Sequence, residues 1–295
     1  MKKWLEILGA PSGGRSGGTA TLMSRFTHDE FDAEWYRQET GEGRFQRVLM
    51  LFPKGLTALA PAVAVPFYFP EAMIGYDPET GEELERYRGI EMMLQLVRRG
   101  YIVASADAYH LSYIDSDKAR GDFSRWQDAA DALHRNHPHY SGMGKLVDDT
   151  RLMIDLIAAD RRVDSGRIGI AGHSLGGKMA FYTGCLDVRV KAILASDFGI
   201  GWHQTNWQSD WYFGNALPKM IADGFDHAEL LSLAGKPFCL IAGQYDTDES
   251  YRIMCRAKAY KEGDARLGFI NHATGHKPPL WALDAGYDFL DKWLK

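Results

Sequence analysis

The fold is decided by one stretch of sequence, Arg167-Ile-Gly-Ile-Ala-Gly-His-Ser174-Leu-Gly-Gly-Lys178. It predicts a buried strand, a tight Gly-x-Ser-x-Gly turn and the first turn of a helix. In that context the strained turn lifts the serine hydroxyl above the edge of a parallel sheet. The flanking glycines are needed because a side chain there would collide with the crowded strand and helix. We therefore predict that Ser174 is a nucleophile.

The same pattern occurs a second time, at Gly14-Arg-Ser16-Gly-Gly18. No apolar run precedes this copy, and it lies in the glycine-rich patch 11–18. Without a strand to position the turn, Ser16 is expected to be a chance match.

Strands and helices alternate on both sides of the decisive stretch. Apolar runs typical of strands lie at 47–52, 62–69, 101–106, 167–172, 190–195, 237–243 and 267–271. Helical patterns lie at 87–99, from Asp148 or Asp149 as cap to 160, and at 175–185, 247–262 and 279–295. Strands separated by helices of about ten residues predict a mainly parallel sheet covered on both faces.

This organisation is typical of an α/β protein with the α/β-hydrolase fold. The segments near 110–144 and 199–226 are expected to be loop insertions, and residues 46–295 a catalytic domain. The first 45 residues show no clear period and are expected to form an irregular arm packed on that domain.

Composition narrows the class of protein. The chain has 295 residues, 45% of them hydrophobic, and a net charge of −5, with acidic and basic residues interspersed. We expect neither nucleic acid nor membrane as a partner, since there is no basic patch and no apolar run of roughly 18 residues. Three cysteines make no disulfide or metal framework, and the short apolar stretch after Met1 contains Glu6, so no signal peptide is predicted. A cytoplasmic protein without a cofactor is expected, and the oligomeric state is left open.

A serine nucleophile needs a base that is oriented by a carboxylate, and in this fold the order along the chain is serine, acid, histidine. Asp246 follows the strand that ends at Gly243, at the edge where active-site groups of open α/β sheets gather. We predict that Asp246 is the acid. Asp248 and Glu249 are alternatives that are better explained as residues of a helix N-terminus.

Two histidines, His272 and His276, lie downstream of Asp246. His276 lies in a loop ahead of the last helix, next to a glycine, and is the predicted base. His272 almost belongs to the strand and is the alternative. The cluster formed by His134, His137 and His139 has no cysteine or carboxylate within its run, so no metal site is predicted.

Several segments are similar to dienelactone-hydrolase-like and acetyl-xylan-esterase-like α/β-hydrolases. They are Val163-Asp through Lys178, Asp187-Val-Arg-Val-Lys-Ala192, Gly243-Gln-Tyr-Asp246 and Ser141-Gly-Met-Gly-Lys145. The resemblance covers about residues 60–295 and implies a catalytic triad of Ser174, Asp246 and His276. Dienelactone hydrolase itself uses a cysteine nucleophile, so the serine of this chain points toward the esterases.

Two donors are expected to form an oxyanion hole. The backbone N–H of Leu175 lies at the start of the helix after the nucleophile. Relatives carry His-Gly-rich sequence after the third strand, whereas this chain has an aromatic run, in which Tyr68 is the predicted second donor by its backbone or its hydroxyl. Phe67 and Phe69 are alternatives, and Pro70 has no N–H to donate. The aromatic run also predicts a narrow acyl pocket that suits small groups such as acetyl.

The insertion after residue 195 carries Trp202, Trp207 and Trp211 among Asn, Gln and Asp. Flat aromatic faces beside polar groups are typical of a surface that stacks on sugars. The alternative is a cap whose rings pack against the body. The predicted function is hydrolysis of a small-molecule ester through an acyl-enzyme, with a small acyl group and a carbohydrate as the candidate alcohol. A peptidase or amidase with the same triad, and a binding protein without catalysis, are the alternatives.

Overall fold

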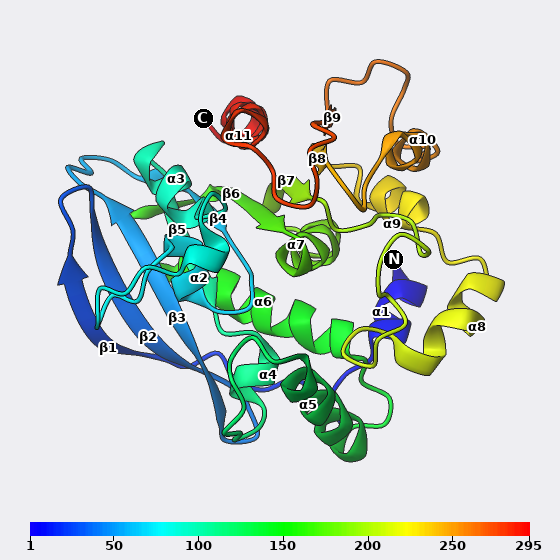
Figure 1. Cartoon of the computed structure of the whole chain (residues 1–295), viewed down its shortest axis with the longest axis horizontal. Helices are drawn as coiled ribbons and strands as arrows, with labels where there is room; N and C mark the ends of the chain where they lie inside the picture. Colours follow the sequence, from blue (N-terminus) through cyan, green and yellow to red (C-terminus); the bar gives the residue numbers. More distant parts are fainter.

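The computed structural model describes residues 1–295 and has one nine-stranded sheet at its centre (Figure 1). The strands are β1 (Ala20–Thr27), β2 (Phe31–Gly41), β3 (Arg44–Pro53), β4 (Ala60–Ala64), β5 (Ile102–Ala106), β6 (Val163–His173), β7 (Val190–Ser196), β8 (Phe238–Ala242) and β9 (Leu267–Asn271). They lie in the order β1-β2-β3-β5-β4-β6-β7-β8-β9. From β5 to β9 all neighbours are parallel, whereas β1, β2 and β3 join antiparallel at one edge.

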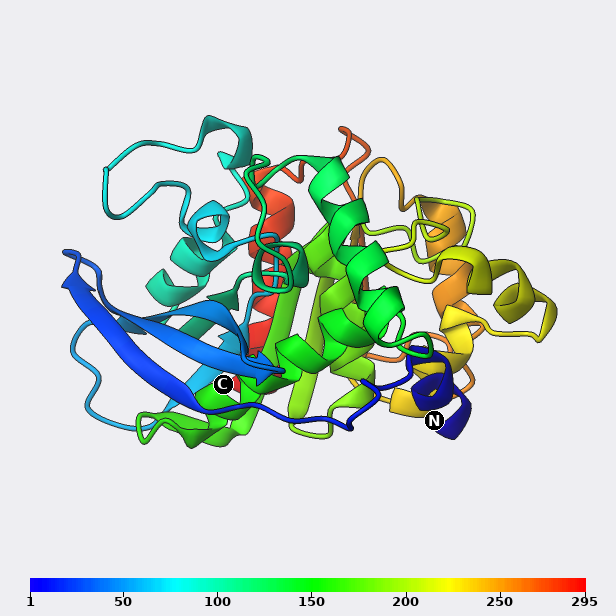
Figure 2. The same ribbon diagram turned by 90° about the horizontal axis from the view of Figure 1, so that it is seen from below.

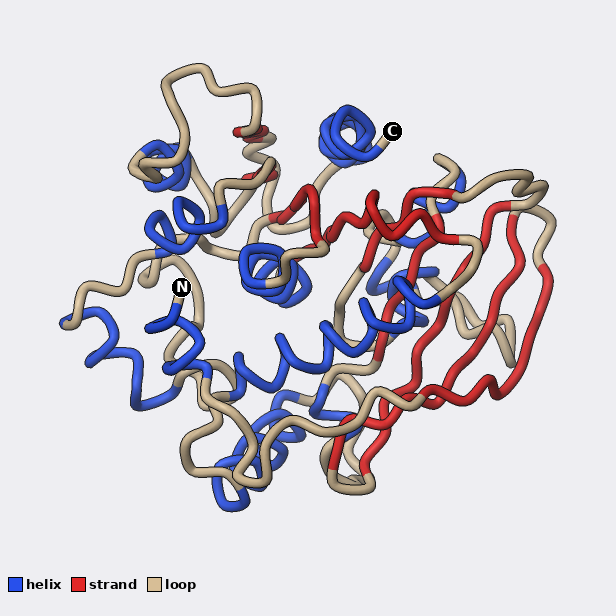
Figure 3. Tube along the Cα trace, turned by 180° about the vertical axis from the view of Figure 1, so that it is seen from behind, coloured by secondary structure: helices blue, strands red, loops and turns tan.

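Helices cover both faces of this sheet. The α-helices of the chain are α1 (Lys2–Leu8), α2 (Pro70–Ile74), α3 (Met92–Arg98), α4 (Tyr109–Ser112), α5 (Phe123–Asn136), α6 (Gly142–Ala159), α7 (Leu175–Leu186), α8 (Leu217–Ala222), α9 (His227–Ala234), α10 (Asp248–Cys255) and α11 (Leu280–Leu294). Figure 1 shows α3 and α11 on one side of the sheet and α6 and α7 on the other. Seen from behind, the strands form one twisted band between these helices (Figure 3).

The two faces of the sheet make two separate hydrophobic cores. One core joins the sheet to α6, α7 and α9, and the other joins it to α2, α3 and α11. All residues of β4, β5 and β8 are buried, which explains why these strands are continuously apolar rather than alternating. The prediction of an α/β-hydrolase architecture with a mainly parallel sheet is confirmed.

The prediction of an irregular N-terminal arm is wrong for much of its length. Residues 20–41 form β1 and β2, and β2 carries buried Phe31 and Ala33 on one face. The sequence signal for β1 is weak because β1 is an edge strand that buries none of its residues. Its apolar residues therefore need not alternate with polar ones. The longest stretch of residues 1–45 without regular secondary structure joins α1 and β1, and in Figure 2 it runs across the molecule beside α6.

Helix α6 begins earlier than the predicted cap at Asp148 or Asp149. Ser141 is the cap, because its hydroxyl accepts a hydrogen bond from the N–H of Gly144. Gly142 permits this start, since a Cβ atom there would lie 2.3 Å from the carbonyl oxygen of Trp211. No helix in the structure is long and apolar enough to span a lipid bilayer.

Candidate active site

Ser174 lies at the sharp turn between β6 and α7. Its φ is +55°, a value that residues other than glycine rarely adopt and that is often found at functional sites. The turn requires glycine on both sides: a Cβ at Gly172 would lie 2.1 Å from the carbonyl oxygen of Gly176, and one at Gly176 would lie 2.2 Å from that of Pro66. The predicted strand, turn and helix around Ser174 are therefore present.

His276 reaches Ser174 from the loop between β9 and α11. Its Nε2 lies 2.9 Å from the Ser174 Oγ. Gly275, directly before it, has a φ of +110°, and this backbone conformation aims the imidazole back over the sheet. The alternative, His272, pairs its Nδ1 with the Thr274 hydroxyl at 2.7 Å and hydrogen-bonds neither Ser174 nor Asp197. Of the two candidate bases, the structure brings His276 to the serine.

The carboxylate that meets His276 is Asp197. Its Oδ2 lies 2.6 Å from the His276 Nδ1, and the side chain is fully buried. Asp197 directly follows β7, the strand beside β6, and has a φ of +43°. Ser174, His276 and Asp197 thus form a continuous chain of hydrogen bonds from hydroxyl to imidazole to carboxylate.

The prediction that Asp246 pairs with the histidine is wrong. Both of its oxygens are occupied, at 2.8 Å each, by the N–H groups of Phe198, Gly199 and Ile200 and by the Ser250 hydroxyl. Asp246 follows β8, one strand further from Ser174, and its carboxylate turns toward the loop after β7. It holds the loop that follows Asp197 and makes no hydrogen bond to His276.

The two carboxylates support each other's loops. While Asp246 accepts from the loop after β7, Asp197 Oδ1 accepts from the N–H groups of the loop after β8, residues 243–246, at 2.9–3.2 Å. Burial pushes the pKa of Asp197 upward, but the bond from His276 and these N–H groups hold it below its ordinary value. At Asp246 burial prevails over its N–H donors and raises the pKa to about 6.

A signal for Asp197 was present in the sequence. The segment Ala195-Ser-Asp197-Phe-Gly199 places a carboxylate at the end of the strand next to the nucleophile strand. Asp197 directly follows its strand, whereas Asp246 lies four residues after the end of β8. Order along the chain admits either residue, because both lie between Ser174 and His276.

The hydroxyl of Ser174 opens into a cavity of about 640 Å³. Aromatic side chains line much of it: Tyr68, Phe123, Trp126, Trp211, Tyr212 and Tyr245. Both predicted oxyanion donors, Leu175 and Tyr68, are among the lining residues, and Leu175 is the first residue of α7. A free N–H at a helix start suits a developing negative charge.

The three tryptophans of the insertion have different positions. Trp211 lines the cavity and packs beside the buried Trp126, with their ring centroids 6.4 Å apart. Trp207 is fully buried and donates to the carbonyl of Gly199 at 2.7 Å. Trp202 packs on His227 and donates to the carbonyl of Phe225. The prediction that all three form the substrate surface is therefore wrong for Trp202 and Trp207, which pack the insertion onto the body, as in the alternative interpretation.

Lys178 is a cavity residue that was not predicted from the sequence. It lies one helical turn after Ser174, and its ammonium group donates to Asn206 Oδ1 at 2.9 Å. The same group lies over the rings of Tyr212 and Trp207, at 4.3 and 4.6 Å. Burial lowers the pKa of Lys178 to about 7. The cavity thus holds a cation that loses its proton easily.

Comparison with known proteins agrees with this fold. The family model described as the dienelactone hydrolase family matches residues 82–205. No curated protein sequence matches the chain significantly. The resemblance to dienelactone-hydrolase-like α/β-hydrolases is confirmed by the family match and the fold.

Solved structures of esterases are similar to the whole chain. A glucuronoyl esterase from Solibacter usitatus has a TM-score of 0.72 at 14% identity, over 97% of this chain and 88% of that one. A glucuronoyl esterase from Teredinibacter turnerae has a TM-score of 0.66 at 18% identity, over 97% and 81%. An acetyl xylan esterase from Paenibacillus sp. R4 has a TM-score of 0.63 at 17% identity, over 94% and 88%. At these identities the likeness establishes the shared fold.

Proposed function

We propose that the protein is a serine carboxylic-ester hydrolase that works through an acyl-enzyme. The observation that carries this proposal is the hydrogen-bonded chain of Ser174, His276 and Asp197 at the base of a cavity. His276 takes the proton of the Ser174 hydroxyl as the oxygen attacks the ester carbonyl carbon. Asp197 stabilises the imidazolium and holds Nδ1 protonated, so that Nε2 is free to act as the base.

The tetrahedral oxyanion is assigned to the N–H of Leu175 and to a second donor at Tyr68. His276 then gives its proton to the leaving alcohol oxygen, and the bond between that oxygen and the acyl carbon breaks. Water enters, loses a proton to His276, and attacks the acyl carbon; the carboxylic acid leaves as Ser174 regains its proton. At the end of the cycle Ser174, His276 and Asp197 are in the protonation states in which they began it.

The proposed substrate is a small-acyl ester of a carbohydrate. Trp211 and Phe123 supply flat apolar faces, and Lys178, Asn206 and Gln208 supply polar groups on the same cavity. Such a mixture suits a sugar ring, whose C–H face stacks on aromatic rings while its hydroxyls take hydrogen bonds. The acetyl xylan and glucuronoyl esterases among the similar structures support a carbohydrate ester.

A fluorophosphonate probe and a matched pair of variants test the proposal. The wild type should be labelled at Ser174 and should hydrolyse p-nitrophenyl acetate and acetylated xylo-oligosaccharides. Ser174→Ala should lose both labelling and at least ~10³-fold in kcat, whereas Ser16→Ala should keep them. A wild-type protein that is not labelled and hydrolyses neither ester would refute the proposal. Faster hydrolysis of an amide than of the matching ester would indicate an amidase instead.

A further inference from the structure

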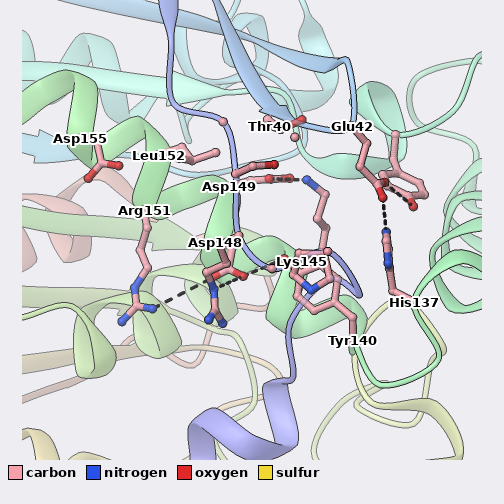
Figure 4. A pocket seen from close by; sticks show the side chains of 18 of the residues that line it. Thr40, Glu42, His137, Tyr140, Lys145, Asp148, Asp149, Arg151, Leu152 and Asp155 are labelled. Atoms are coloured by element: carbon pink, nitrogen blue, oxygen red, sulfur yellow. Dashed lines mark hydrogen bonds and ion pairs between the residues drawn. The ribbon is translucent and has the colours of Figure 1, made fainter.

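A second cavity lies against α6. It has a volume of about 560 Å³, within the range of small-molecule sites, and shares no lining residue with the Ser174 cavity. It is covered by the glycine-rich residues 11–17, which we call the strap. Figure 4 shows the strap passing beside α6, opposite the end of β2. We refer to this space as the strap cavity.

The strap is held in place at several points. The Ser12 N–H donates to His137 Nδ1 at 3.0 Å, and the Arg15 Nε donates to Asp148 at 2.7 Å. Gly17 has a φ of +107°, and a Cβ there would lie 2.6 Å from the carbonyl oxygen of Glu39. These hydrogen bonds and the glycine conformation hold the strap over the cavity. The Gly-x-Ser-x-Gly pattern around Ser16 therefore has a structural explanation that involves no catalysis.

Every Lys, Arg and Asp side chain around the strap cavity has a partner of opposite charge within the protein. Lys145 pairs with Asp149, and Glu42 Oε1 lies 2.9 Å from His137 Nε2 (Figure 4). The three arginines also pair: Arg15 with Asp148, Arg189 with Asp155 and Asp187, and Arg151 with Asp148 and Asp187. A charged ligand would have to break one of these pairs or stay uncompensated, which is costly in a partly buried site.

Two buried oxygen atoms on the strap cavity have no hydrogen-bond partner. They are Asp149 Oδ2 and Thr40 Oγ1. The Asp149 side chain is only 4% exposed, and burial raises its pKa to about 6 although Lys145 opposes this. Buried polar groups are nearly always paired, because leaving one unpaired destabilises the fold. Ligand hydroxyls would satisfy these atoms, since a hydroxyl can donate to a carboxylate and can either donate to or accept from a threonine hydroxyl.

We propose that the strap cavity binds a neutral polyhydroxylated molecule such as a short sugar. Its hydroxyl groups donate to Asp149 Oδ2 and pair with Thr40 Oγ1. The rings of Tyr113 and Tyr140 and the side chain of Leu152 line the same cavity and face the C–H groups of the ligand. The site is separate from the Ser174 cavity, and its existence does not depend on the esterase proposal.

Titration calorimetry of the full chain with xylobiose, and with glucuronate and glucosamine as charged counterparts, tests this inference. Xylobiose should bind saturably, and the charged sugars at least ~10-fold more weakly, because each would have to break an ion pair on the cavity wall. Thr40→Val keeps the shape of the side chain and removes the unpaired oxygen, so it should weaken xylobiose binding about tenfold while the urea midpoint stays equal or rises. Asp149→Asn should weaken binding as well.

Lys178→Met is the matched control, because it alters the Ser174 cavity alone. It should leave unchanged the xylobiose binding that Thr40→Val weakens. The inference is overturned if no saturable binding is found, if either charged sugar binds best, or if Lys178→Met abolishes binding while Thr40→Val leaves it intact. The last result would place the sugar in the Ser174 cavity, and none of the readouts requires ester turnover.

Discussion

Two isosteric substitutions, Asp197→Asn and Asp246→Asn, separate the roles of the two buried carboxylates. In Asp197→Asn the amide oxygen stays with the N–H groups of residues 243–246, so the amide nitrogen must face His276 Nδ1. Nδ1 then has to accept a hydrogen bond, the proton moves to Nε2, and the imidazole cannot take the proton of Ser174. An Asp-to-Asn change that selects the wrong tautomer costs about 10⁴-fold in kcat, which corresponds to roughly 5 kcal/mol.

Asp246→Asn should instead lower the free energy of unfolding. With its amide oxygen toward the N–H groups of Phe198 and Gly199, its nitrogen faces the N–H of Ile200 and the Ser250 oxygen. Ser250 can accept from the amide, so one buried N–H loses its partner at a cost of about 1–3 kcal/mol. We expect kcat to fall by less than about tenfold, because Asp197 still holds His276 in the tautomer that can accept the serine proton.

Urea unfolding and p-nitrophenyl acetate turnover, measured on both variants, check this pair. Asp197→Asn should unfold near the wild-type midpoint and be almost inactive, and Asp246→Asn should unfold earlier and remain active. The reverse pattern, with a folded but dead Asp246→Asn and an active Asp197→Asn, would refute the assignment and restore the acid that was predicted from the sequence.

Other variants test the remaining assignments. His276→Ala should lose at least ~10³-fold in kcat. An equally low kcat in His272→Ala, with full activity in His276→Ala, would show that His272 is the base. Trp207→Ala should lower the free energy of unfolding by about 3–5 kcal/mol because its ring is fully buried, while Trp211→Ala should mainly raise KM for acetylated sugars. Burial lowers the pKa of Lys178 to about 7, so between about pH 7 and 10 the unfolded chain binds a proton that the folded chain lacks, and stability rises with pH. Urea midpoints at about pH 7.5 and 9.5 should therefore show a smaller rise in Lys178→Met.

The parallel half of the fold was predictable because its signals are local. Continuous apolar runs mark β4 to β8, and the crowded glycines around Ser174 leave little choice of conformation. The edge strand β1 was missed because it buries no residue, so its sequence carries no periodic signal. The start of α6 was missed because the Ser141 cap competes with two later carboxylates that also suit a helix N-terminus.

The sequence offers both Asp197 and Asp246 as the acid, and the choice between them is decided by how two loops turn. Asp197 and Asp246 lie in the loops that follow the neighbouring strands β7 and β8, and order along the chain allows either to meet His276. Both carboxylates have a role in the structure, since each accepts hydrogen bonds from the N–H groups of the loop that carries the other. Only one of them also reaches the imidazole, and it is the one beside β6, because the serine and its histidine lie above that strand. Asp246 therefore holds the loop that follows Asp197 without a hydrogen bond to Ser174 or His276. The two asparagine variants separate this structural role from the catalytic role of Asp197, because one should lower stability and the other kcat.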